Sequence, residues 1–189
     1  MRSTLLATLA IAAAAPLAAQ GSMATMPGMT QQPTTGYRAE VIKQMATVSD
    51  HMVQLANAIP QEKFTWRPGP GVRSVAEVFL HITQAQYLFG APIGVKPPAG
   101  MDMKTFETST TDKTQIIAAM KAAFAAMSAA IAAMPDANLE NPVKLFGMTM
   151  TTRGLLLMET DHNAEHYGQM IAYSRVNGVV PPWSMQAGN

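Results

Sequence analysis

The stretch that decides the fold covers residues 152–177 and reads TRGLLLMETDHNAEHYGQMIAYSRVN. It contains no proline, while Gly178 follows it directly and Pro181 lies just beyond, which is the usual pattern at the end of a helix. One face of the expected helix, at spacings of three and four, combines apolar side chains with groups that bind metals or carry protons. This face consists of Leu155, Glu159, His162, His166, Gln169 and Tyr173.

Three earlier segments show the same helical periodicity. Pro60 and Pro135 end the first and the third of them, and the capping box Ser74-x-x-Glu77 opens the second. Four amphipathic segments without a run of alternating strands predict an all-α fold, a four-helix bundle. Two of the connections are long enough to cross over a bundle end, and residues 143–150 could be extended. The predicted helices cover residues 37–59, 74–90, 111–134 and 152–177.

The N-terminus has the pattern of a secretory signal peptide. Arg2 precedes an apolar run over residues 5–19, which is too short for a comfortable membrane span and ends in small residues. We expect cleavage near Ala19, export to the periplasm or the medium, and no stable membrane anchor afterwards; an uncleaved anchor is the alternative. The expected organisation is a signal peptide (1–19), a flexible leader (20–36), the helical bundle (37–184) and a tail (185–189).

Composition excludes several functional classes. The chain has no cysteine, which excludes disulfides, thiolate metal ligands and a cysteine nucleophile. Lys and Arg number 13 against 12 Asp and Glu, and no basic stripe stands out, so we expect no nucleic-acid partner. The sequence also shows no nucleophile elbow and no glycine-rich phosphate loop.

Metal binding is the chemistry that the histidines indicate. His162 and His166 lie four residues apart, so a helix places both imidazoles on one face, where they can chelate one ion. A solvated face is the alternative, but the flanking Leu155, Met158 and Met170 favour an inward orientation. A metal would also satisfy polar groups that face the core.

The other two histidines are less informative by spacing alone. His81 lies between Val78 and Ile82 beside an apolar face, where a histidine is commonly a core or boundary residue, although it could complete a set of three imidazoles. His51 lies at the edge of the first apolar stripe and is interpreted as a boundary residue, or as one that supports a ligand.

Two other motifs offer alternatives. Residues 162–166 match H-x-x-E-H, a zinc-protease signature, but no acidic residue follows Glu165 to serve as the further ligand, which argues against a peptidase. Met23, Met26 and Met29 recur every third residue in the leader and could bind Cu(I) through their thioethers; chance in a methionine-rich chain is the simpler explanation.

Three pieces of sequence together resemble the DinB-like (damage-inducible) metalloprotein superfamily of four-helix bundles. They are WRPGPGVRSVAEVFLH at residues 66–81, HNAEHYGQ at 162–169 and AYSRVNGVVPP at 172–182. The resemblance spans residues 37–184 and implies a divalent metal held by His81, His162 and His166, with coordination positions open for water or substrate. Bundles of this family are often dimers, so a homodimer is a candidate assembly.

The site is therefore expected to be a three-histidine metal centre. Imidazole ligands suit Zn²⁺ or Ni²⁺ best, and Fe or Mn remain open. Glu159, one turn before His162, is the candidate catalytic residue, as a general base or as a carboxylate that orients a histidine. The candidates for holding the ligands in place are Gln169, Glu77 and Tyr173.

These features predict an exported, divalent-metal-binding protein. We expect a metal-dependent enzyme of hydrolase or transferase type that acts on a small molecule of unknown identity. The first alternative is a protein that binds or senses a metal, or acts in stress, without catalysis. The second is a purely structural bundle with an empty polar pocket.

Overall fold

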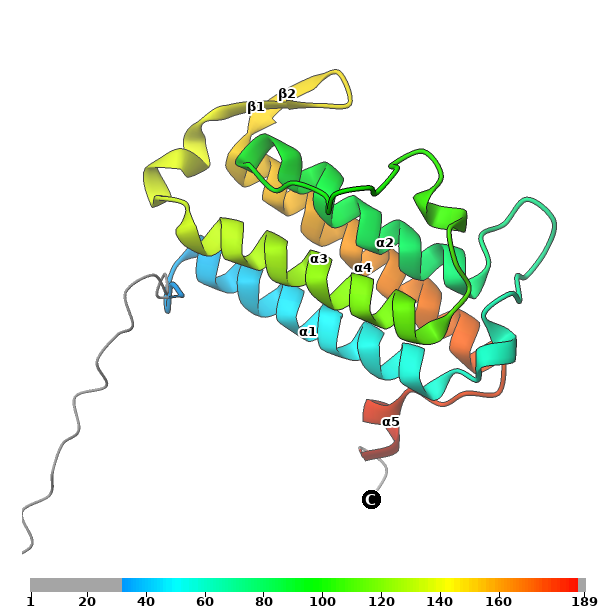
Figure 1. The fold of residues 1–189 in the computed structure, drawn as a ribbon. Coiled ribbons are helices and arrows are strands. Elements are labelled where there is room, and N and C mark those ends of the chain that lie inside the picture. Colours follow the sequence, from blue (N-terminus) through cyan, green and yellow to red (C-terminus); the bar gives the residue numbers. More distant parts are fainter. Residues whose placement is uncertain (1–31, 187–189) are drawn as a thin grey trace, which may run out of the picture.

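Four long helices form a bundle in the computed structural model, which describes residues 32–186 (Figure 1). The predicted signal peptide, most of the predicted leader and the methionine triplet lie outside the described residues. The mostly helical fold that the sequence predicts is confirmed, and each end of a long helix lies within two residues of its predicted position. The helices are α1 (Tyr37–Ala58), α2 (Val75–Gly90), α3 (Lys113–Ala133) and α4 (Thr152–Val176).

Side-chain caps explain where three of these helices begin. The hydroxyl of Ser74 accepts from the backbone N–H of Glu77 at 3.3 Å, and the Glu77 carboxylate accepts from the backbone N–H of Ser74 at 2.7 Å, so the predicted capping box is present. The side chains of Asp112 and Thr151 cap α3 and α4, and each accepts one hydrogen bond from a backbone N–H of the first turn. Each cap satisfies a backbone donor that the first helical turn leaves without a partner.

The long connection between α2 and α3 positions the site. Among the long helices, α1 and α2 each pack against α3 and α4, and α2 also packs against the connection that follows it. Figure 1 shows α1 and α4 running in one direction and α2 and α3 in the other, so residues 91–112 return along the whole bundle. This crossover includes two 3₁₀ turns, η2 (Ala91–Ile93) and η3 (Phe106–Thr108), and η3 lies against α2.

A β-hairpin stands at the end of the bundle where α4 begins. Its strands, β1 (Pro142–Leu145) and β2 (Met148–Thr151), are antiparallel, and Leu145 pairs with Met148. The two residues between them, Phe146 (φ 52°) and Gly147 (φ 76°), are both left-handed, as in a type I′ turn. The extended stretch that the sequence suggested is therefore a hairpin.

Shorter helices complete the described chain. The 3₁₀ turns η1 (Gln61–Lys63) and η4 (Asp136–Glu140) lie in the connections after α1 and α3. The helix α5 (Pro182–Gln186), which the sequence did not predict, lies against α1, where Trp183 stacks on His51 with ring centroids 4.0 Å apart. It therefore includes the first two residues of the predicted tail.

The predicted apolar stripes form the core. The apolar stripe of the first predicted helix is fully buried, and it consists of Val41, Met45, Val48, Met52, Leu55 and Ile59. Of the seven apolar residues in the stripe of the third predicted helix, five are buried, and Ile117 and Met134 are partly buried. One described helix, α3, is long and apolar enough to cross a membrane. Five of its six large apolar side chains are buried inside the bundle, which is an ordinary reason for such hydropathy in a core helix. They are Ile116, Met120, Phe124, Met127 and Ile131.

Candidate metal centre

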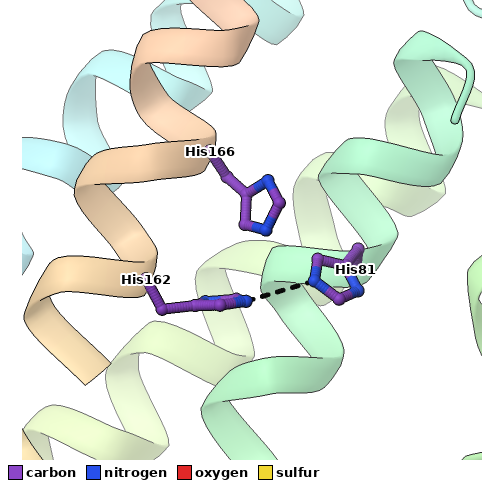
Figure 2. A group of neighbouring side chains, drawn as sticks. All are labelled: His81, His162 and His166. Atoms are coloured by element: carbon purple, nitrogen blue, oxygen red, sulfur yellow. Dashed lines mark hydrogen bonds between the residues drawn. The ribbon is translucent and has the colours of Figure 1, made fainter. Parts of the chain in front are cut away.

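Three imidazoles meet between α2 and α4 (Figure 2). His162 and His166 project from one face of α4 because they lie four residues apart, and α2 brings His81 opposite them. One nitrogen from each ring lies within 4.8 Å of the other two, and His81 Nε2 lies 3.1 Å from His162 Nε2. The structure therefore unites the helical pair with His81, whose role the spacing alone had left open.

The outer nitrogens of two rings are held by oxygen atoms. His81 Nδ1 lies 2.6 Å from Glu107 Oε1, and His166 Nδ1 lies 2.7 Å from Gln169 Oε1. Because these oxygens only accept hydrogen bonds, each Nδ1 must carry the proton. The unprotonated Nε2 atoms of both rings then remain available as ligands, in the arrangement common at histidine metal sites.

The residues present fit a divalent metal ion. Two metal–nitrogen bonds of about 2.0–2.1 Å at a tetrahedral angle place their nitrogens roughly 3.4 Å apart. The three ligand nitrogens, all within 4.8 Å of one another, need only small adjustments to reach such spacing. His162 Nδ1 is buried without a hydrogen-bond partner among the described residues, so this ring, unlike the other two, is not held by polar contacts on its outer side.

Burial keeps the imidazoles in the form that binds metals. It lowers the pKa of His162 to about 4, and the neighbouring His166 and His81 act in the same direction. Burial also lowers the pKa of His81, against the opposing effect of the Glu107 carboxylate. Both rings are therefore neutral at pH 7, as ligation requires.

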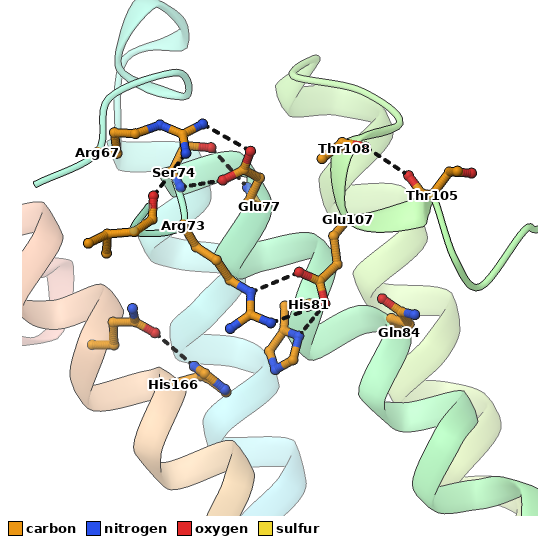
Figure 3. A network of polar contacts seen from close by, with 12 residues as sticks. Arg67, Arg73, Ser74, Glu77, His81, Gln84, Thr105, Glu107, Thr108 and His166 are labelled. Atoms are coloured by element: carbon orange, nitrogen blue, oxygen red, sulfur yellow. Dashed lines mark hydrogen bonds and ion pairs between the residues drawn. The ribbon is translucent and has the colours of Figure 1, made fainter. Parts of the chain in front are cut away.

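Glu107 is the site residue that sequence reasoning missed. It comes from η3 in the crossover, and it bonds Arg73 as well as His81, with Arg73 Nε 2.8 Å from its Oε2 (Figure 3). Burial alone would raise the pKa of Glu107, but the hydrogen bonds from Arg73 and His81 outweigh it and lower the pKa. The carboxylate is thus ionised and orients His81. Glu107 and His81 lie on different elements, so no helical spacing relates them. Their contact can be recognised only from the course of the crossover in the structure.

A second chain of contacts supports His166. Gln169 Nε2 donates to the Tyr173 hydroxyl at 3.1 Å, and this hydroxyl donates to the backbone carbonyl of Arg73 at 3.1 Å. Gln169 is thereby fixed with its oxygen toward His166. Gln169 and Tyr173 are two of the three predicted supporting residues. In the structure they form a chain of hydrogen bonds from His166 to the loop before α2.

Glu77, the third predicted supporting residue, lies elsewhere. It caps α2 and pairs with Arg67 at 2.9 Å, one turn before His81 (Figure 3). Burial would raise the pKa of Glu77, but bonds from the Ser74 backbone and from Arg67 lower it. Within residues 32–186 it makes no hydrogen bond to a histidine, so its described role is to fix the start of the helix that carries His81.

Glu159 lies in the core. It is fully buried, accepts a hydrogen bond from the Asn163 side chain, and burial raises its pKa to about 7. Asn163 in turn accepts from Gln86 Nε2 at 2.9 Å. None of its described hydrogen bonds reaches the three histidines, so its role as a general base remains a prediction that these contacts do not test.

Two other sequence candidates lie away from the centre. His51 bonds the Tyr167 hydroxyl at 2.6 Å and stacks on Trp183. Glu165, the acidic residue of the H-x-x-E-H pattern, is exposed on α4. In the described part of the chain, the acidic residue of this motif therefore does not lie beside His162 and His166, where a peptidase mechanism would need it.

A cavity of about 240 Å³ opens beside the metal centre. Both α2 and the hairpin contribute to it, and two of the three histidines form part of its wall. Its lining consists of His81, Gln84, Ala85, Leu88, Phe89, Glu107, Phe146 and His162. The three-histidine centre therefore has an accessible side, where a small molecule could approach a bound metal ion.

A helical bundle with three histidines between two of its helices defines a class of metal-binding protein. The sequence profile of the DinB superfamily, a metal-binding superfamily, matches residues 44–170, which include all three histidines. The chain belongs to the DinB superfamily.

Solved structures share this fold. A DinB-like protein from Bacillus cereus ATCC 10987 superimposes with a TM-score of 0.66 at 19% identity, over 75% of this chain and 93% of that one. A DinB-like protein from Bacillus subtilis gives 0.59 at 21% identity, over 74% and 92%. At such identities the likeness concerns the fold. No curated protein matches the chain.

Proposed function

We propose that this protein is an exported, metal-dependent enzyme of hydrolase or transferase type that acts on a small molecule. One observation carries the proposal: three imidazoles converge on one point, and a cavity borders two of them. A closed storage or structural site needs no such cavity, whereas a catalytic metal keeps an open position.

The bound ion would act as a Lewis acid on a substrate donor atom. His81, His162 and His166 hold the ion. Glu107 and Gln169 keep the protons on the outer nitrogens of His81 and His166, so that the inner nitrogens stay free. The imidazole set favours Zn²⁺ or Ni²⁺, with Fe and Mn as alternatives that ligand type does not exclude.

Elemental analysis tests the metal part of the proposal. The sample is the mature chain, residues 20–189, purified without a histidine tag, beside His81→Ala. The variant His51→Ala is the matched control, because it removes the histidine that lies outside the centre. We expect about one equivalent of a first-row metal in the wild type and the control, and loss in His81→Ala. Full occupancy in His81→Ala, or a wild type that refuses added Zn²⁺ and Ni²⁺, would overturn the assignment.

Catalysis and export have separate tests. A substrate screen with the metal-loaded protein should find an activity that His162→Ala lacks; a protein that binds metal but turns over no ester, amide or thiol-transfer substrate would favour the non-catalytic alternative. Export is supported by the apolar run after Arg2, outside the described residues. Intact mass of the periplasmic protein should show loss of residues 1–19, and an unprocessed cytoplasmic chain would exclude export.

A further inference from the structure

The cavity beside the metal centre has two kinds of lining residue. It combines the imidazoles of His81 and His162 with the apolar side chains of Leu88, Phe89 and Phe146. Its volume of about 240 Å³ is several times the roughly 30 Å³ that one water takes in the liquid. The space therefore suits an organic group of ring size next to the ion.

Phe146 occupies the tip of the hairpin in an unusual way. Its backbone is left-handed (φ 52°), a conformation that type I′ turns ordinarily give to Asn, Asp or Gly. Its side chain is 59% exposed, yet the ring meets Phe89 edge-on with centroids 6.0 Å apart. Core packing and turn preference do not explain an exposed aromatic ring there. Its place in the lining of the cavity gives the ring a role at this position.

Gln84 is a polar residue in the lining of the same cavity. Its Nε2 donates to the backbone carbonyl of Met103, which fixes the amide. Its Oε1 is buried and has no hydrogen-bond partner among the described residues, so this oxygen is closed off from a ligand in the cavity. The contacts that the cavity offers a ligand are therefore mainly apolar.

The charges near the cavity narrow the ligand class. Glu107 is the only charged side chain among the lining residues, and Arg73 already pairs with it. No lysine or arginine belongs to that lining, so apart from the proposed metal ion nothing there offers a phosphate the charged donors that bind it. Nucleotides and sugar phosphates therefore fit this space poorly.

We propose that the cavity binds a small organic ligand with an aromatic or branched apolar body and a metal-binding head, and that Phe146 determines selectivity for the apolar body. This inference rests on the proposed metal site. It adds the chemical class of the ligand and a residue that selects it.

Two probes with the same head test this proposal. Benzohydroxamate and acetohydroxamate both coordinate metals, but only the first has a ring. Their binding to the Co²⁺-loaded protein is followed by the visible absorption of the ion. Burying much of a phenyl ring should make benzohydroxamate roughly tenfold tighter or more.

Variants assign the preference to the cavity wall. Phe146→Gly removes the ring at a position where glycine suits the backbone, so the hairpin should persist. We expect it to lower the preference for benzohydroxamate several-fold, with Co²⁺ stoichiometry and acetohydroxamate affinity unchanged. Leu88→Ala, on α2, should act in the same direction. Met148→Ala is the matched control, because Met148 is exposed on the same hairpin but is not part of the lining.

The outcomes separate the two proposals. A protein that binds Co²⁺ but holds both probes equally, or keeps its preference in both Phe146→Gly and Leu88→Ala, would overturn the ligand assignment alone. A protein that binds no Co²⁺ would overturn the metal site, and the ligand assignment with it.

Discussion

Replacing Glu159 by glutamine should remove a large part of the pH dependence of stability. The carboxyl is fully buried, and burial raises its pKa to about 7, against 4.5 for the ordinary side chain. Between these pH values the folded protein keeps a proton that the unfolded chain releases. The stabilisation is complete below about pH 4.5 and is lost as the pH rises through about 7, because the folded state must then bury a charge.

The magnitude follows from the same two values. The difference between about 7 and 4.5 is about 2.5 pH units, which corresponds to roughly 3 to 4 kcal/mol at about 1.4 kcal/mol per unit. The side chain has no exposed surface, so solvent screening does not reduce this figure much. The glutamine variant does not titrate, so its stability relative to the wild type should rise by roughly 3 to 4 kcal/mol between pH 4.5 and pH 8.

Urea unfolding followed by circular dichroism, with EDTA present, measures this difference at the two pH values. Titration of His81 and His162 cancels, because both proteins contain these residues. Glu165→Gln is the matched control, since it makes the same chemical change at an exposed position of α4. An equal gap between wild type and Glu159→Gln at both pH values would refute the reasoning. The same variant should retain its metal, and loss of turnover in it would support the predicted catalytic role.

Further predictions concern the metal site and the fold. Glu107→Gln should weaken metal binding by roughly 10–100-fold, measured by chelator competition, because the carboxylate orients His81. Zn²⁺ at about 100 times its dissociation constant should stabilise the wild type by about 2.7 kcal/mol in thermal unfolding, and His166→Ala should abolish this gain. Ser74→Ala should cost about 1 kcal/mol through loss of the cap on α2, and equal urea midpoints would contradict this. Leu55→Ala, at a fully buried position, should cost about 2–5 kcal/mol in the same assay.

Local patterns predicted the helices because their causes are local. The capping box at Ser74 and the proline after α1 act within a few residues of the helix ends that they determine. The four-residue spacing of His162 and His166 fixes their shared face without any tertiary contact. His81 needed the resemblance to the DinB superfamily, because one histidine beside an apolar face has no spacing partner.

Residues brought in by the crossover and the hairpin could not be predicted in this way. Glu107 reaches His81 only because residues 91–112 return along the bundle and seat η3 against α2. Phe146 reaches the cavity only because residues 142–151 fold into a hairpin with a two-residue turn. Neither segment has a sequence periodicity that predicts contact with the histidines, so the contribution of each segment to the site depends on tertiary packing.

Glu159 lies close to the metal-site histidines on the surface of α4, yet it makes different contacts. Glu159 and Asn163 lie about 40° apart on a helical wheel, as do His162 and His166, and the two pairs are separated by only about 60°. A sequence argument that accepts a quarter turn places Glu159 on one face with His162 and His166. In the structure the first pair hydrogen-bonds within the core, while His162 and His166 meet His81 on α2. A rotation of about one sixth of a turn thus separates the polar pair in the core from the imidazoles that face the metal centre.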